Sequence, residues 1–288
     1  MACKEQDVFL SERQIKEWSG NIREEMSTKT GENIRIESLT TMEQFERCVV
    51  LQLEVWGYSD GDLIPRRVFL VAQRIGGQVL GAFDGDTIIG FAMALPGYRN
   101  GYAYIHSHML AVLPEYRNAG LGRRLKLAQR DDAIARGFDL MEWTYDPLEI
   151  KNAHLNIAKL GAISRRYKAD FYGPSSSPLQ GGLPTDRLYA EWWLKSSRVV
   201  KTLRGETGTP DTVERVTVPH AIYEWKQDPE RRSKAQQVQW SNRAALESAF
   251  SRGLAVVGYE RDSEGNGSFL LAPWNDEQEQ TRSYDAKR

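Results

Sequence analysis

Apolar residues recur along the chain with two periods, and each period predicts its own kind of element. Alternation with period two indicates half-buried strands, and spacing of three and four residues indicates amphipathic helices. Asp84-Gly85 separates two apolar runs, which is a hairpin signal. In order, the pattern predicts an edge strand at 33–38, helices at 40–56 and 67–74, strands at 79–83, 88–95 and 109–113, a helix at 123–136, a strand at 140–145, a helix from 152 to about 160 and a strand at 189–194. Interleaved strands and helices of this kind indicate an α+β chain.

Both ends of the chain differ from this central array. Residues 1–31 are mostly polar and are expected to be an appendage, with one short amphipathic helix at 11–26. Order returns after a Gly/Thr/Pro-rich stretch near 205–210. A strand at 213–218, a helix at 229–251 and a hairpin at 254–271 predict a smaller C-terminal α/β half-domain over 211–274. The remaining residues, 275–288, read as a loose tail.

Composition narrows the functional classes. The net charge of −1 and the lack of Lys/Arg runs give no footprint for nucleic acid or an anionic membrane, so a small-molecule partner is expected. Two cysteines are too few for a disulfide framework, and no apolar run reaches the length of a membrane span. The first residues lack the pattern of a signal peptide, so a cytoplasmic location is the expectation.

A glycine turn between the strand at 109–113 and the following helix is the most informative motif. Its glycines allow close backbone approach, and the first free N–H groups of the helix point at a bound anion with the positive end of the helix dipole behind them. Neither a P-loop nor a G-x-G-x-x-G dinucleotide fingerprint is present. The residues expected to bind a phosphate group here are Arg117, Asn118, Ala119, Gly120, Leu121, Gly122 and Arg123.

This turn, R-x-x-G-x-G, and the order of elements around it resemble motif A of the GNAT superfamily of acyl-CoA-dependent N-acyltransferases. The resemblance implies a GNAT domain over 32–197, with a mixed, mostly antiparallel sheet whose two strands around motif A splay apart to admit the pantetheine arm. It implies an acyl-CoA cosubstrate, acetyl-CoA or succinyl-CoA, no metal, and a homodimer as the common state of the superfamily. Main-chain groups of Leu110, Ala111 and Val112 would bind the arm, and their N–H groups would stabilise the oxyanion.

Two histidines on the motif A strand are candidates for the base. His106 and His108 lie two residues apart, so both side chains face the same side of the strand. His106 falls where several GNAT enzymes have a carboxylate base, and an ordinary imidazole pKa suits proton transfer near neutrality. The alternative for either residue is a hydrogen-bonded structural histidine.

The general acid is less apparent, because Ile157 occupies the position where relatives often carry a tyrosine. Tyr145, another nearby phenol or water is the expected substitute. Asn152 and Asn156 lie one turn apart, and the resemblance implies that they contact pantetheine or the departing thiol. Asn152 has an ordinary helix N-cap as its alternative.

Acceptor binding is expected from two other stretches. In GNAT proteins the first two helices form part of the acceptor pocket, which makes Trp56 a wall residue unless it is simply core. Arg187 follows a Gly-Gly-Leu-Pro-Thr-Asp loop and could pair with a substrate carboxylate, or structurally with Asp186 or Glu191.

The segment containing Arg187 also resembles one GNAT branch that carries a C-terminal extension and is linked to N-acylation, including succinylation, of amino acids. Three functions therefore stay open: an N-acyltransferase for a small amine such as an amino acid, a sensor or scaffold that binds acyl-CoA without turnover, and a protein N-acetyltransferase.

Overall fold

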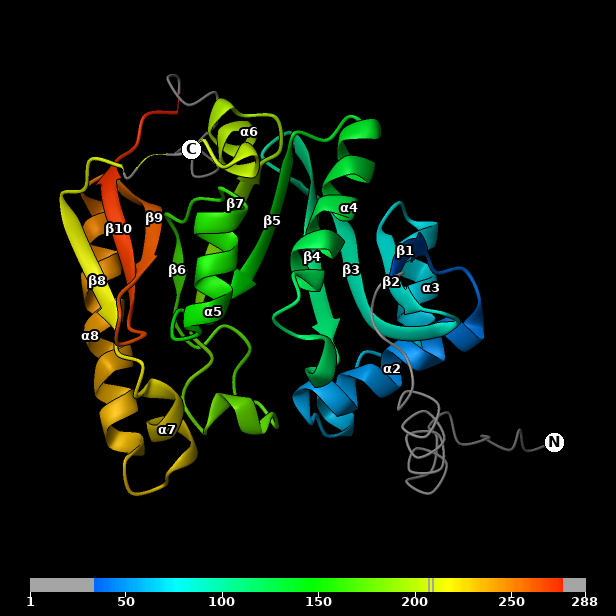
Figure 1. Ribbon diagram of the computed structural model, residues 1–288, viewed down its shortest axis with the longest axis horizontal. Coiled ribbons are helices and arrows are strands. Elements are labelled where there is room, and N and C mark those ends of the chain that lie inside the picture. Colours follow the sequence, from blue (N-terminus) through cyan, green and yellow to red (C-terminus); the bar gives the residue numbers. More distant parts are fainter. Residues whose placement is uncertain (1–33, 207, 209, 277–288) are drawn as a thin grey trace.

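Two sheets with helices packed on them make up the computed structural model, which describes residues 34–206, 208 and 210–276. Figure 1 shows the larger sheet in the middle, with β8–β10, α7 and α8 beyond β6 and β7 at the side opposite β1 and α3. The predicted appendage, 1–31, lies outside the described residues, as does most of the predicted tail, 275–288.

The larger sheet has seven strands in the order β1-β2-β3-β4-β5-β7-β6. Every neighbouring pair is antiparallel except β4 and β5, which are parallel. The predicted α+β class with a mixed, mostly antiparallel sheet is therefore confirmed. The strands are β1 (Arg35–Ser38), β2 (Gln78–Asp84), β3 (Thr87–Arg99), β4 (Tyr102–Val112), β5 (Leu140–Tyr145), β6 (Tyr167–Lys168) and β7 (Arg187–Trp193).

Helices cover the two faces of this sheet. On one face Phe91 of β3 meets the rings of Phe69 and Trp56, which come from α3 (Arg66–Arg74) and α2 (Met42–Trp56). On the other face Leu110 of β4 lies under Gly122 of α4 (Leu121–Ala135). Side chains of β4 therefore point alternately toward α2 and toward α4.

Two short helical pieces follow β5. The predicted single helix is α5 (Ile150–Ala153), which continues directly as the π-helical turn η3 (His154–Lys159). Single π-helical turns are uncommon and often lie at functional sites. The 3₁₀ turns are η1 (Asp60–Asp62), η2 (Pro114–Tyr116) and η4 (Pro178–Gln180).

The C-terminal part contains α6 (Ser197–Arg204), β8 (Glu214–Val218), α7 (Ile222–Gln227), α8 (Arg232–Ser251), β9 (Leu254–Arg261) and β10 (Gly267–Pro273). Its three strands form an antiparallel sheet in the order β8-β10-β9. One continuous core joins this sheet and α8 to β5, β7 and η3, and Ser164 bridges to Val256 of β9. Residues 214–273 are called the C-terminal layer below.

Candidate active site

A wedge opens between β4 and β5. The two parallel strands pair only at Ile105 with Met141 and at His106 with Glu142, although both strands continue beyond this row. Figure 1 shows β4 and β5 diverging. Main-chain groups of β4 that face β5 past His106 are thus left without a strand partner, as in an edge that binds an extended ligand. The splaying expected from the sequence is present.

A β-bulge accompanies the wedge. The pairing of β3 with β4 runs from Met93 opposite Met109 to Ala94 opposite Ser107, which leaves His108 as the extra residue on β4. Bulges bend a strand and re-aim its side chains, and they are common next to active sites. The bend lies close to the last row that β4 shares with β5.

Only two of the three predicted main-chain contacts face the wedge. Leu113 N–H donates to Ile89 of β3, and antiparallel ladders alternate, so Ala111 also belongs to the ladder with β3. Leu110 and Val112 face the other way. The prediction for Ala111 is therefore wrong, because the hydrogen-bonding direction reverses at each residue of a strand. Arg117 Nε donates to the Val112 carbonyl at 3.1 Å, which anchors the glycine turn to the end of β4.

The glycine turn itself is exposed and shaped for an anion. Asn118 and Gly120 have φ values of 65° and 77°, and Gly120 is the N-cap of α4 without any side-chain cap. The first N–H groups of α4 therefore have no capping side chain to bond with. Ala119 lies exposed within the turn, whereas Leu121 is buried in the core.

The remaining predicted member of this motif points elsewhere. Arg123 Nη2 donates to the Leu203 carbonyl of α6 at 3.4 Å. The cationic groups of both Arg117 and Arg123 thus bond to main-chain carbonyls of the protein.

His106 and His108 do face the same side of β4, with ring centroids 6.1 Å apart. This is the face covered by α2, not the face under α4. Burial lowers the pKa of His106 to about 4, against the opposing attraction of Glu142, while His108 and Lys126 push it in the same direction as burial. Burial also lowers the pKa of His108. The expectation of an ordinary imidazole pKa is therefore wrong: both rings are neutral at neutral pH, because the sheet and its helices desolvate them.

A buried ion network surrounds the base of the wedge on this same face. Glu142 Oε2 accepts from Arg99 at 2.8 Å and from Arg166 at 2.7 Å. Arg166 also reaches Glu191 at 3.2 Å, and Glu191 is bound by Arg165 at 2.9 Å. Both carboxylates are 1% exposed. The sequence prediction missed this network, whose signal is a glutamate in the middle of each apolar strand run.

Aromatic and cationic groups gather further along this face. Trp56 is half-buried, stacks on Tyr58 at 5.5 Å and contacts Phe91, so it belongs partly to the core. Burial raises the pKa of Tyr58, and the nearby guanidinium of Arg187 opposes that shift. The Arg187 guanidinium also lies 5.3 Å from the ring of Tyr172.

Neither of the two carboxylates expected beside Arg187 pairs with it, although Arg187 Nη1 donates to the Asp186 main-chain carbonyl at 3.4 Å. Asp186 accepts a bidentate pair of bonds from Arg243 of α8 at 2.7 and 2.8 Å, and it also accepts from Tyr167. Glu191 is held by the arginines of the network. Within the described part of the chain Arg187 forms no ion pair.

The predicted acids and amides lie on the α4 side. Tyr145 is 2% exposed, and its hydroxyl is 3.1 Å from Ser164 Oγ toward the C-terminal layer, where burial raises its pKa. Asn156 Nδ2 donates to Asn152 Oδ1 at 3.4 Å, as their spacing predicts. The N-cap of α5 is Glu149, so the N-cap alternative for Asn152 is wrong.

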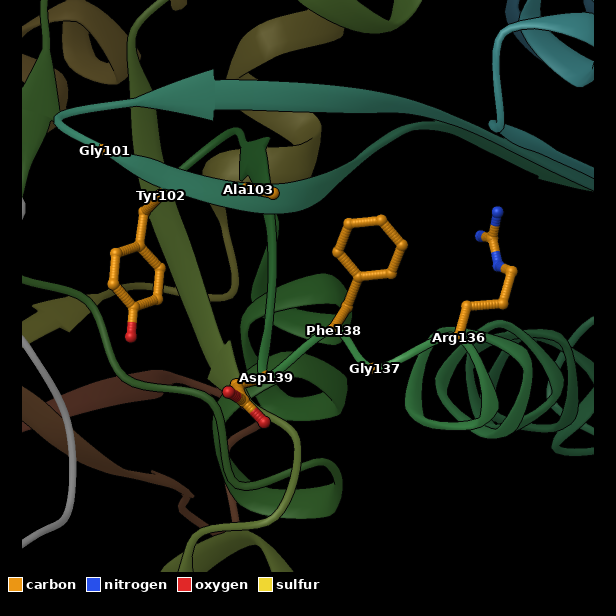
Figure 2. Close-up of a pocket in the computed structure, with 7 residues that line it drawn as sticks. All are labelled: Gly101, Tyr102, Ala103, Arg136, Gly137, Phe138 and Asp139. Atoms are coloured by element: carbon orange, nitrogen blue, oxygen red, sulfur yellow. The ribbon is translucent and has the colours of Figure 1, made fainter.

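A pocket of about 380 Å³ lies at the far end of the same strands. Figure 2 shows Tyr102, Phe138 and Asp139 around it, from the start of β4 and the connection between α4 and β5. The glycine turn follows the opposite end of β4, roughly 30 Å away at the rise of an extended strand. This pocket is therefore separate from the anion-binding turn.

Two absences hold for residues 34–206, 208 and 210–276. This region contains no group of three or more His, Cys, Asp or Glu side chains placed to hold a metal ion. It also contains no helix that is both long and apolar enough to cross a membrane.

Comparison with known proteins agrees with this geometry. Residues 41–155 match the family model of the acetyltransferase (GNAT) family. The match places a GNAT acetyltransferase domain in this part of the chain. A search of curated proteins found no match.

Solved structures of the same kind are similar to part of the chain. The ribosomal-protein-S18-alanine N-acetyltransferase from Escherichia coli has 14% identity over 63% of this chain and 99% of its own, with a TM-score of 0.46. A GNAT family acetyltransferase from Elizabethkingia anophelis with acetyl-CoA bound has 15% identity over 56% and 99%, with a TM-score of 0.42. An IAA acetyltransferase from Bacillus cereus has 16% identity over 55% and 98%, with a TM-score of 0.40.

Proposed function

We propose that the protein is an N-acyltransferase that moves an acetyl or succinyl group from CoA to the amine of a small molecule that also carries a carboxylate, namely an amino acid. The observation that carries the proposal is the half-buried Arg187, a guanidinium without an ion pair among the described residues, on the sheet face that also presents His106.

The donor side of the proposal follows from the wedge and the turn. The pyrophosphate of CoA would bind the uncapped N–H groups at the start of α4, where the helix dipole favours negative charge. The pantetheine arm would run along β4 and bond to the main chain of Leu110 and Val112. Leu110 N–H is then the nearest candidate for stabilising the oxyanion.

The acceptor side rests on strand register. Glu142 connects His106 on β4 to Glu191 on β7, and Arg187 follows on the same face of β7, since alternate residues of a strand share a face. Two strand spacings and four residues along β7 separate the Cα atoms of His106 and Arg187 by roughly 16 Å. An amino acid bound on this face would have its amine toward His106 and its carboxylate toward Arg187.

The chemistry assigns one role to His106. As the acceptor nitrogen attacks the thioester carbonyl, the nitrogen becomes cationic and its proton passes to the neutral imidazole, directly or through one water. A C–N bond forms, the C–S bond breaks and the sulfur leaves with the electron pair. A pKa of about 4 keeps the imidazole unprotonated at working pH, although it also makes His106 a weak base.

The test is thiol release from acetyl-CoA and succinyl-CoA with amino acids and with their decarboxylated amines as matched acceptors. We expect wild-type turnover with an amino acid, and an Arg187→Gln variant whose KM for the amino acid rises about tenfold or more, as expected for the loss of a charged hydrogen-bonded pair. The KM for the decarboxylated amine should stay unchanged, which makes this amine the internal control.

Two results would overturn the proposal. An equal rise in KM for the amino acid and for its decarboxylated amine in the Arg187→Gln variant would show that Arg187 does not bind the carboxylate. Turnover of peptide N-termini or lysine side chains, with none of the free amino acids, would assign the domain to protein substrates.

A further inference from the structure

Lys126 is a buried lysine at the apex of the wedge. It projects from α4, is 4% exposed and places Nζ 2.7 Å from Ser107 Oγ of β4. The same nitrogen lies 3.6 Å from the ring centroid of Trp143 on β5. One amine therefore touches both strands of the wedge.

Lys126 contacts β4 and β5 at the row where their pairing ends. The last paired row of β4 and β5 is His106 with Glu142, so Ser107 and Trp143 form the first row in which the strands no longer bond to each other. Lys126 occupies this row from the α4 side. A pantetheine arm bound in the wedge as proposed above would end with its sulfur near this row.

The surroundings of Lys126 offer no carboxylate. Ser107 Oγ is shared with the buried amide of Gln129 on the next turn of α4, at 2.9 Å. Among the described residues Lys126 forms no ion pair, and across the sheet it interacts with the imidazole of His106, on the opposite face. Burial alone lowers the pKa of Lys126 well below its usual value.

A second buried lysine provides the contrast. Lys226 reaches Asp146 at 3.1 Å and Glu149 at 2.9 Å, and these two carboxylates raise its pKa despite burial. Lys226 is thus an ordinary buried ion group. Lys126 instead has only a hydroxyl and a ring face beside its amine, so its ammonium form is weakly stabilised and readily releases a proton to an incoming anion.

We propose that Lys126 protonates the thiolate of CoA as it leaves. The inference rests on the proposed acyl transfer: when the C–S bond breaks, the electron pair goes to sulfur, an Nζ–H proton passes from the Lys126 ammonium to sulfur, and CoA leaves as the thiol. Neutral Lys126 recovers its proton from solvent before the next turnover, while His106 returns to solvent the proton taken from the acceptor nitrogen.

Other groups on the α4 side are less suited to this task. Ile157 has no proton to donate, and the Tyr145 hydroxyl is held by Ser164 in the core. An ammonium whose charge is poorly stabilised is a better match to a thiol than either, since proton transfer is most efficient between groups of similar pKa.

The test compares Lys126→Met and Lys126→Gln with wild type and with Lys159→Met, a change at an exposed lysine at the end of η3. Melting temperature, Kd for CoA and the pH profile of kcat are measured for each. We expect both Lys126 variants to bind CoA within about threefold of wild type and to lose about 100-fold or more in kcat. The fall of kcat that accompanies loss of the Lys126 proton as the pH rises should disappear in both variants and remain in Lys159→Met.

Activity of the Lys126 variants within a few-fold of wild type, with the fall of kcat at rising pH unchanged, would overturn the proposal. A loss confined to CoA affinity would do the same, because that is the result of a purely structural lysine. If neither variant folds, a wild-type kcat that stays level to the alkaline limit of stability refutes the proton donor. Absence of any wild-type turnover would instead count against the proposed function.

Discussion

The buried imidazole of His106 links the stability of the protein to pH. Its pKa is about 4 in the folded chain, against 6.5 for an unperturbed histidine, so between these values the unfolded chain binds more protons than the folded one. The free energy of unfolding must therefore fall as the pH decreases from about 6.5 toward 4. The stabilisation is fully present above that window.

The size of the effect follows from the shift. The full difference in pKa corresponds to about 3 kcal/mol, and integration of the linkage relation from pH 8 to pH 5 gives about 2 kcal/mol for His106 alone. A His106→Gln variant has no titrating group at this position. Its free energy of unfolding should therefore fall by about 2 kcal/mol less than that of wild type between pH 8 and pH 5.

Urea denaturation of both proteins at pH 8 and pH 5 measures this double difference. The comparison removes the contributions of His108 and of other groups that titrate in the same range, because these are common to both proteins. Equal losses of unfolding free energy in wild type and His106→Gln would show that the imidazole is not desolvated. The reasoning about a neutral base would then fail with it.

Three further predictions concern other parts of the molecule. Arg243→Gln removes the bidentate partner of Asp186, and we expect a rise of about tenfold in the KM for an amino acid acceptor with little change in kcat; a matching rise for the decarboxylated amine would contradict this. Gly120→Ala forces a φ of 77° on a residue with a side chain, so we expect weaker CoA binding by calorimetry and a loss of about 1–2 kcal/mol of unfolding free energy by thermal melting. Gly76→Ala, which has a φ of 90° but lies away from the turn, should lower stability without weakening CoA binding. Lys226→Met leaves the buried carboxylate of Asp146 and the partly exposed one of Glu149 without their cation, and it should cost about 3–5 kcal/mol in urea denaturation at pH 7. A loss under about 1 kcal/mol would mean that water reaches Asp146.

The order of strands and helices could be predicted because the apolar periods are strong. β5 was predicted to the residue, and the Asp-Gly hairpin between β2 and β3 formed where expected. β3 extends further than predicted, to Arg99, and β4 begins earlier than predicted, at Tyr102. The two strands pair with each other over this added length, where polar residues give no apolar signal in the sequence. α6 and α7 were missed, being short helices beside loop-like composition.

The site was predicted as far as local spacing reaches. The shared face of His106 and His108 follows from a period of two, and the glycine turn follows from one hexapeptide. The pKa of His106 was misjudged, because desolvation depends on α2 and the sheet, which are remote in sequence. The partners of Glu142 lie 24 and 43 residues away, a separation that no periodicity encodes.

Lys126 escaped notice for a related reason. Within residues 123–136 it looks like one more cation on a polar helix, and only the packing of α4 on the sheet turns it inward. A lysine at an inward position of a helix can be recognised from sequence when the register is known, since its neighbours three and four residues away are then apolar. Here Gln129 and Arg130 occupy those positions, so the register was hidden.

The proposed base and acid lie on opposite faces of the sheet, yet they are electrostatically coupled, because the charge of Lys126 is among the groups that lower the pKa of His106. Loss of the Lys126 proton to the departing sulfur would remove that repulsion, and His106 would then hold the proton of the acceptor nitrogen more tightly. The two transfers would support each other through the sheet. The coupling can be measured without turnover: in Lys126→Met the pKa of His106, followed by NMR of labelled histidine, should be higher than in wild type. An unchanged or lower value would mean that the two groups act independently.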